Sequence, residues 1–343
     1  MTSRSPESSI WRRALRARRG RAGLACVIFL SLLALLGPLI ANDEPIVCRH
    51  DGAWHFPALV EAVHVLPWGS RLVEKSAPFH LPTFDAKRDL DPSSFALWPP
   101  VCFGPEQVSS DVLQAPSGRH WLGTDDVGRA VVARLVHGAA ASLRVGLASM
   151  LIAGVVGVVI GGTAGYFGSW PDALLSRLIE VVVCFPVFFL VLGLMVWLEP
   201  GVGNVVLVIG LTRWTSIARY TRAEFIRLKS HDFVTAARAS GAGPVRIMGR
   251  HLLPNALSPI LVSLSFGVAG AILIETALSW LGFGVQPPTP SWGNMLRVAW
   301  EHMETAPHLL YPPCIAIFLA VLGFNLLGDA VRDAANPAAE VRP

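Results

Sequence analysis

The segment VGLASMLIAGVVGVVIGGTAGY, residues Val145–Tyr166, decides the class of fold, because it contains no charged side chain along its whole length. At 1.5 Å of rise per residue, a helix of this length crosses the ~30 Å hydrocarbon core of a bilayer. Its glycine-rich part, Gly154–Gly165, suits close helix packing, since small residues let neighbouring backbones approach. The segment therefore predicts a transmembrane helix that packs tightly against another helix.

The composition of the whole chain agrees with a membrane protein. Its 343 residues are 52% hydrophobic and 15% charged, with a mean hydropathy of +0.51, whereas soluble domains carry about a quarter charged residues. Five further apolar runs lie at Gly23–Ala41, Leu178–Leu198, Val202–Ile217, Leu257–Leu278 and His308–Gly328. The first run is longer than the core of a secretory signal peptide, which favours a retained anchor over a cleaved leader. We expect an all-α integral membrane protein with six transmembrane helices.

The distribution of charge orients these spans. The tail 1–22 contains seven arginines and one acid; the arginines are Arg4, Arg12, Arg13, Arg16, Arg18, Arg19 and Arg21. A nucleic-acid-binding tail is the alternative, but basic residues beside a span typically mark the cytoplasmic side. The stretch 213–250 carries eight basic residues against two acids, whereas the connection 199–203 has one acid and no base. Six spans with both termini in the cytoplasm, including the tail 331–343, satisfy this pattern.

The segment 42–142 differs from the rest of the chain. It is rich in Pro, Trp, Asp and His and has no continuous apolar stretch, so we expect a periplasmic insert between the first two spans, with some β-like or irregular structure. Cys48 and Cys102 both fall in this insert. A disulfide between them suits an oxidising compartment, and free thiols are the alternative. The remaining core, 143–330, would hold five helices.

The cytoplasmic stretch 223–254 ends in HDFVTAARASGAGPVRIMGRHLLP. Helix formers dominate up to Ser240, and Gly241 is a natural stop because glycine accepts the left-handed conformation after a helix. Pro244 suits the first position of a second short helix, and Pro254 is expected to break the chain again. The pattern predicts a helix–turn–helix elbow with small residues at its bend, where a partner can approach the backbone.

The elbow also resembles a known element, the EAA loop of ABC importer permeases. The resemblance rests on the spacing of Ala236, Ala237, Gly241, Leu253 and Pro254. The chain departs from the pattern at Thr235, where glutamate is frequent, and at His251, where an aliphatic residue is usual. In that family the loop docks in a groove on a separate ATPase subunit. The resemblance implies that these residues, His251 included, couple transport to ATP hydrolysis in a partner chain.

Three further segments resemble the C subunits of dipeptide and oligopeptide permeases. They are HWLGTDDVGR at His120–Arg129 with Ser142-Leu143 after it, LGFGVQPPTPSWG at Leu281–Gly293, and FNLLGD at Phe324–Asp329. Ala130 stands where the family usually has aspartate. In the insert, Leu39–Leu59 and Ala96–Gly104 are similar to longer-loop permeases associated with microcin C uptake.

The resemblance implies a type I ABC importer permease core in a bacterial inner membrane. Its partners would be a second homologous permease, two ATPase subunits, a periplasmic solute-binding protein, the peptide cargo and membrane lipid, with no nucleic acid. A nickel or glycoside importer on the same scaffold is an alternative. A self-sufficient secondary transporter is another, although that class tends to show internal repeats, and we find none in this sequence.

The chain itself lacks a catalytic constellation. A phosphate-binding P-loop needs a lysine after a glycine, and none of Lys75, Lys87 and Lys229 follows one. We therefore expect no enzyme activity, cofactor or metal site in this chain, with ATP and magnesium bound by the partner ATPases.

Three residues inside the apolar runs are candidates for the transport pathway or its gating. Glu275 and Arg213 are costly in hydrocarbon unless they face protein or water. The alternatives are pairing with a neighbouring helix for Glu275, and snorkelling or pairing for Arg213. Pro186 is expected to kink the third span and is a candidate hinge. The sequence leaves these roles open, together with the length and side-chain preference of the peptide.

Overall fold

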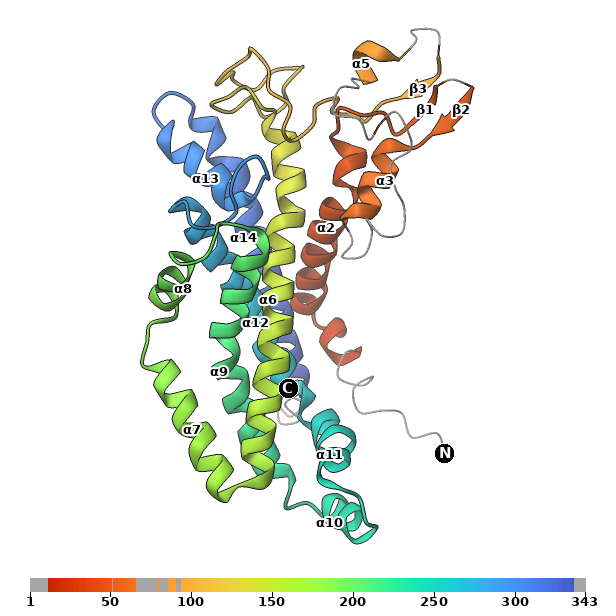
Figure 1. The fold of residues 1–343 in the computed structure, drawn as a ribbon. Coiled ribbons are helices and arrows are strands. Elements are labelled where there is room, and N and C mark those ends of the chain that lie inside the picture. The colour runs from red at the N-terminus through yellow and green to blue at the C-terminus, as the bar shows by residue number, and fades with distance from the viewer. Residues whose placement is uncertain (1–11, 51, 66–78, 80–85, 91–93, 336–343) are drawn as a thin grey trace. The chain divides into compact units, whose positions relative to one another are not determined.

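The computed structural model describes residues 12–50, 52–65, 79, 86–90 and 94–335, which are mostly helical (Figure 1). Arg4 of the basic tail lies outside these residues. The long helices are α2 (Arg18–Ile40), α6 (Val131–Phe167), α9 (Val202–Leu228), α12 (Leu253–Trp280) and α14 (Tyr311–Ala335). Shorter helices are α3 (Pro57–His64), α5 (Ala86–Asp89), α7 (Ser169–Val183), α8 (Val187–Met195), α10 (Asp232–Ala239), α11 (Pro244–Arg246) and α13 (Trp292–Glu301). A π-helical turn covers Ile247–Leu252, and a 3₁₀ turn covers Pro307–Leu309.

Four helical stretches of the described residues are long and apolar enough to cross a membrane: Arg18–Ile40, Val131–Phe167, Pro244–Trp280 and Pro307–Ala335. Helices α7 and α8 together would give a fifth, but an 80° bend separates them. The kink expected at Pro186 is thus a complete break, and Pro186 precedes the first residue of α8. Helix α9 contains the expected fourth run, but it is not among these candidates; its arginines lower its hydropathy.

Two helix boundaries differ from the sequence-based expectation. Helix α6 begins at Val131, so helical structure starts inside the segment 42–142 that was assigned to the insert. Its first turns contain Arg134 and His137, which interrupt the apolar sequence but have partners in the structure. His137 Nε2 lies 2.7 Å from the carbonyl oxygen of Ala41. At the other end of the chain, α14 continues to Ala335, beyond the expected start of the tail at 331.

The chain divides into two compact units, of which the first comprises residues 1–27, 145–274 and 320–343. In this unit the glycine-rich face of α6 packs against α9 (Figure 1). A Cβ atom on Gly157 would lie 2.7 Å from Ile217 Cβ, and one on Gly165 would lie 2.6 Å from the carbonyl oxygen of Arg222. Gly161 faces the backbone of Ala218. The close helix packing predicted for this stretch is confirmed.

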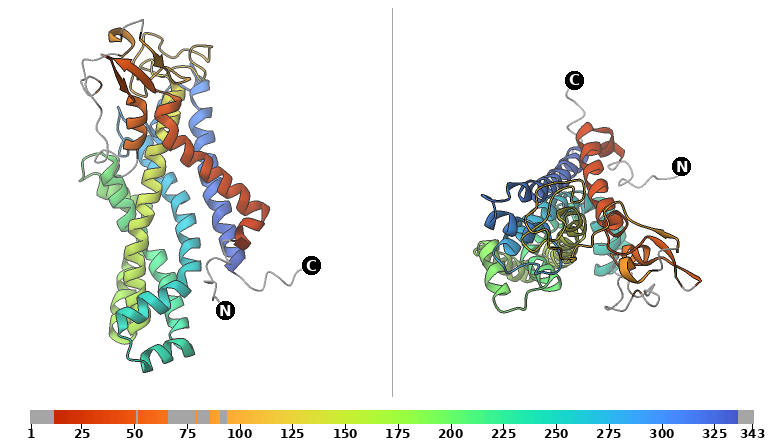
Figure 2. Two further views of the ribbon diagram at one scale, coloured as in Figure 1. Left: turned by 90° about the vertical axis from the view of Figure 1, so that its right-hand side faces the viewer. Right: turned by 90° about the horizontal axis from the view of Figure 1, so that it is seen from above.

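The second unit comprises residues 28–144 and 275–319. It contains a three-stranded antiparallel sheet in the order β2-β1-β3, formed by Ala53–His55, Val47–His50 and Ala96–Leu97 (Figures 1 and 2). The fold is therefore mostly helical and not all-α, and the β-like structure expected in the insert is present.

The two cysteines of the insert are free thiols in the structure, so the disulfide considered for them is not formed. Cys48 is buried in a small apolar cluster with Phe79, Ala86 and Leu90. Burial, reinforced by the negative charge of Glu44, raises the pKa of the Cys48 thiol, which favours the unreactive protonated form. The Sγ atom of Cys102 instead donates to the carbonyl oxygen of Pro99 at 3.3 Å.

Replacing Gly161 with alanine should destabilise the first unit, because the added methyl group would overlap the backbone of Ala218. Overpacking of this kind costs about 1–3 kcal/mol. The matched control is Gly193→Ala in α8, where an added Cβ meets no atom within 4 Å. The measurement is the thermal unfolding midpoint of each detergent-solubilised protein. Equal midpoints for the two variants would show that the α6–α9 contact does not limit stability.

Candidate functional site

The chain after α9 forms the elbow, residues 229–254, from short helical segments (Figures 1 and 2). The continuous helix expected over 223–240 is wrong, because α9 ends at Leu228 and α10 begins at Asp232. The break arises at His231, whose extended backbone (φ −78°, ψ 151°) starts the new helix.

The predicted stop of α10 at Gly241 is confirmed, with φ at +81°. The amide of Gly241 donates to the carbonyl of Arg238 at 3.0 Å, and the amide of Ala242 donates to that of Ala237 at 3.1 Å. This pair of bonds is a Schellman cap, which requires a left-handed residue at the position of Gly241. The bend beside Ala236 and Ala237 is therefore fixed by the backbone conformation of one glycine.

The second half of the elbow continues directly into α12. Pro244 is in the first turn of α11, as expected. Pro254, however, does not break the chain, because it lies in the first turn of α12 directly after the π turn Ile247–Leu252. A proline ring clashes with the carbonyl four residues earlier in a regular helix. The wider π turn relieves that clash, so elbow and helix form one continuous element.

The elbow is held together on its inner side and open on its outer side. Val234 of α10 and both Ile247 and Leu252 of the π turn are buried, and α10 packs against that turn. Among the predicted coupling residues, Ala236, Gly241 and Pro254 are exposed, whereas Ala237, His251 and Leu253 are partly buried. The structure thus places the three small residues at one bend, and the other three at the entry of α12.

An ion pair that the sequence did not reveal holds the C-terminal end of α9 against α7. Arg222 Nη2 lies 2.7 Å from Asp172 Oδ2 of α7, and Lys229 Nζ donates to the carbonyl oxygen of Gly165 at 3.3 Å. These contacts join α6, α7 and α9 just before the elbow. Asp172 gave no signal in the sequence, because only the fold brings it to the arginines of α9.

A cavity of about 730 Å³ lies in the same unit, lined by α6, α9, α12 and the end of α14. Arg213 lines it, and its guanidinium lies over Gly270 of α12, where an added Cβ would be 2.9 Å from Nη2. Tyr220, Ser216 and Asn255 add neutral polar groups to the wall. The structure therefore places Arg213 at a space large enough for a small ligand.

Glu275 is in a different environment, fully buried in the second unit. Its carboxylate accepts hydrogen bonds from Ser279 at 2.8 Å and from Ser142 of α6 at 3.3 Å. Ser142 in turn accepts a bond from the amide of Trp292. These bonds connect Glu275 to the neighbouring helix α6, and a role of Glu275 in the transport pathway stays a prediction. No group of three potential metal ligands occurs among the residues that the structure describes.

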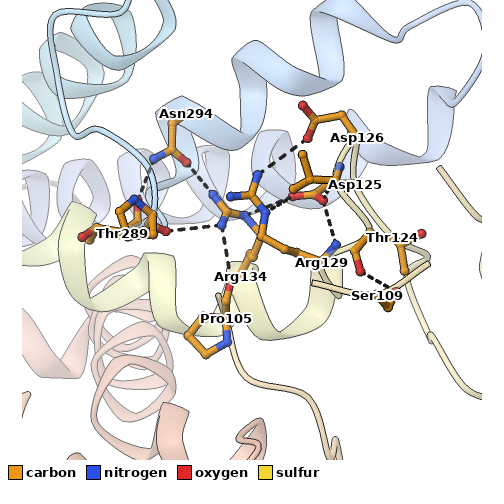
Figure 3. Close-up of polar contacts among 12 residues, drawn as sticks. Pro105, Ser109, Thr124, Asp125, Asp126, Arg129, Arg134, Thr289 and Asn294 are labelled. Atoms are coloured by element: carbon orange, nitrogen blue, oxygen red, sulfur yellow. Dashed lines mark hydrogen bonds and ion pairs between the residues drawn. The ribbon is translucent and has the colours of Figure 1, made fainter. Parts of the chain in front are cut away.

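Figure 3 shows a buried polar cluster around Asp125 in the second unit. The carboxylate of Asp125 accepts bonds from the backbone amide and Nε of Arg129 at 2.8 and 2.7 Å and lies 3.5 Å from Nε of Arg134. Arg134 also donates to Asn294 Oδ1 at 3.3 Å and to the carbonyl of Pro105. Asn294 completes a capping box with Ser291 at the start of α13.

This cluster joins two sequence segments that lie far apart in the chain. The segment His120–Arg129 supplies the carboxylate of Asp125. The side-chain oxygen of Asn294, the residue directly after the segment Leu281–Gly293, accepts the bond from Arg134. Arg134 links the two, although the sequence gave no reason to select it. Its side chain is buried, so the pairing must compensate for the loss of its hydration.

Comparison with known proteins identifies the scaffold that carries these features. The family model for the binding-protein-dependent transport system inner membrane component matches residues 157–341. The model for the N-terminal transmembrane domain of oligopeptide transport permease C matches residues 5–51. The chain belongs to this family of transport permeases. It is a multi-pass inner-membrane permease subunit without catalytic activity or cofactor, and the ATPase of such a transporter is a separate partner.

Several relatives are similar over most of their own length. The dipeptide transport system permease protein DppC of Alkalihalophilus pseudofirmus is 40% identical over 232 residues, 68% of this chain and 76% of the relative. The glutathione transport system permease protein GsiD of Escherichia coli is 39% identical over 222 residues, 65% of this chain and 73% of the relative. The di/tripeptide transport system permease protein DppC of Pseudomonas aeruginosa is 38% identical over 249 residues, 71% of this chain and 82% of the relative.

A solved structure of the MetNI methionine ABC transporter, in an inward-facing conformation, aligns with 58% of this chain and 95% of its own, with a TM-score of 0.47 and 17% identity.

Asp125→Asn should destabilise the second unit strongly, because it leaves the buried guanidinium groups of Arg129 and Arg134 without their main counter-charge. Removing one partner of a buried ion pair costs about 3–5 kcal/mol. The control is Glu180→Gln, which removes a pair whose side chains are 81% and 59% exposed and should change stability by about 0.5 kcal/mol or less. Thermal unfolding of both variants is the measurement, and equal midpoints would contradict the importance of the cluster.

Proposed function

We propose that this chain is a translocation subunit of an ATP-driven ABC importer for small peptides, and that one of the transporter's two ATPase subunits docks on its elbow. A second homologous permease would complete the pathway, and a periplasmic solute-binding protein would deliver the cargo. The structure of the elbow is the main support for this proposal. Two of its small residues, Ala236 and Gly241, are exposed at a capped bend. Its inner side packs on itself, and it continues without a break into α12.

The choice of peptides as cargo rests on the names of the relatives. These name dipeptide, di/tripeptide and glutathione transport systems, and glutathione is itself a small peptide. The similarity of the insert to microcin C permeases extends the proposal to a modified or longer peptide, on the sequence of the insert alone. The cavity of about 730 Å³ is compatible with a cargo of a few residues.

The membrane topology that we propose has six spans, with α9 and the broken α7–α8 pair counted as one span each. Both termini would then be cytoplasmic, and the insert would be periplasmic. The charge distribution supports this arrangement, because the basic residues concentrate in the N-terminal tail and around the elbow, as the positive-inside rule requires.

In this mechanism the elbow transmits ATP-driven closure of the ATPases to the membrane helices. Helix α12 would move with the elbow because the π turn and α12 are continuous. Helix α9 would follow through the short link 229–231, while its ion pair with Asp172 keeps α7 attached to it. The residues proposed for the contact with the ATPase are Ala236, Ala237, Gly241, His251, Leu253 and Pro254.

Gly241→Val should uncouple transport from ATP hydrolysis, because valine disfavours the left-handed backbone of the Schellman cap. Peptide import by the reconstituted transporter should fall about tenfold, equivalent to about 1.4 kcal/mol, while the variant is still inserted in the membrane. Gly243→Val is the control, because Gly243 has φ −72° and ψ 163°, which valine adopts readily, and it has the same open surroundings. Equal import by both variants would contradict the role of the bend.

Ala237→Asp tests the docking contact itself, because it adds a charge beside the bend without changing the cap. We expect less ATPase to co-purify with the permease and import to fall in parallel. Normal import together with full retention of the ATPase would show that the partner docks elsewhere.

A further inference from the structure

We propose that Arg213 binds the terminal carboxylate of the peptide in transit. This inference rests on the proposed function, because it names the group of the cargo that the cavity recognises. The guanidinium of Arg213 lines the cavity, and Gly270 provides the space into which it fits against α12. A Cβ atom at position 270 would lie within 3.1 Å of the guanidinium group, so a side chain there would displace the guanidinium from its present place against α12.

The charges around the cavity are paired, with Arg213 as the exception. Arg227 donates to Glu224 at 2.6 Å, and Arg332 lies 2.8 Å from Asp329. Among the described residues, no carboxylate lies within ion-pair distance of Arg213. A charged side chain inside a membrane helix is costly unless it pairs or faces a water-filled space. The cavity supplies the space, and an anion entering it would supply the partner.

A carboxylate suits this site better than a neutral group would. Guanidinium and carboxylate groups form two parallel charge-assisted hydrogen bonds, which fix both position and orientation. Ser216, Tyr220 and Asn255 line the same cavity and offer hydrogen-bonding groups for the peptide backbone. Every unmodified linear peptide carries one terminal carboxylate, whatever its side chains are. A site of this kind therefore recognises peptides as a class without selecting a sequence.

The binding test uses the assembled transporter, permeases with ATPases, without the solute-binding protein, so that only the pathway contributes. The probes are alanyl-alanine and its C-terminal amide, titrated by calorimetry. We expect Arg213→Gln to weaken binding of the free acid about tenfold, in line with the loss of a charge-assisted bond. Arg213→Lys should retain part of the affinity. The amide should bind wild type and Arg213→Gln equally weakly.

Arg219→Gln is the matched control, because it removes an exposed charge from the same helix that does not line the cavity; its affinity should equal that of wild type. Equal affinity of wild type for acid and amide, or no binding of either, would overturn the inference. Arg213 could instead pair with an acid of the second permease. In that case Arg213→Gln would reduce co-purification of that subunit and leave the difference between acid and amide intact.

A second assay separates this inference from the proposed function. The complete transporter with its binding protein is reconstituted in vesicles, and uptake of labelled alanyl-alanine is measured. Wild-type vesicles that import no peptide would contradict the proposed function itself. If wild type imports the peptide and Arg213→Gln imports it equally well, only the carboxylate site is wrong. We expect import by the variant to fall about tenfold.

Discussion

The glycine face of α6 allows its backbone to touch the backbone of α9, and the rest of the first unit depends on that contact. Gly157, Gly161 and Gly165 leave no room for a side chain between the two helices. In a bilayer the hydrophobic effect does not drive helices together, so association depends on close van der Waals packing. The contact fixes the rotation of α9 about its axis beside α6. It thereby sets the position of Arg213 at the cavity, and the end of α9 leads into the elbow. A change in this packing would therefore reach both parts of the proposed mechanism.

Charged groups are handled in two different ways in this chain. In the second unit, Arg129 and Arg134 both lie against Asp125, with Asp126 3.6 Å from Arg129, and Glu275 is held by serine hydroxyls. These groups are saturated by fixed partners, which suits a scaffold that must remain rigid. In the first unit, Arg213 lies at a cavity and meets no carboxylate among the described residues. Arginine thus stabilises the fold where it has fixed ion-pair partners. Where it faces a cavity without such a partner, it is suited to binding a ligand.

Much of the fold could be predicted from the sequence, because the relevant signals are local. The long apolar runs, the left-handed Gly241 and the tight glycine face each follow from neighbouring residues alone. The errors arise where distant partners, or an unusual turn of helix, decide the outcome. The segment 42–142 was assigned to the insert, yet α6 begins within it, and its polar residues Arg134 and His137 are satisfied by residues far away in the chain. Pro254 was expected to break the chain, but the π turn before it accommodates the ring. The pairing of Asp172 with Arg222 spans 50 positions, so no pattern within one segment could have revealed it.

Two helices that line the cavity, α9 and α12, lead to the two ends of the elbow. Arg213, Tyr220, Glu224 and Arg227 lie along α9 and all line the cavity, and α9 ends at Leu228, directly before the elbow. From the other side, Asn255 lines the cavity within the first turn of α12, directly after the elbow. The connection to α12 is helical, and the link 229–231 between α9 and α10 is only three residues long. A displacement of the elbow is therefore passed to the cavity wall with little loss along the way. A partner that moves the elbow would therefore change the position of Arg213 relative to Gly270. If Arg213 binds a carboxylate and the elbow binds the ATPase, as proposed, the affinity for the carboxylate and the state of the ATPase would be coupled. By thermodynamic linkage each would then influence the other.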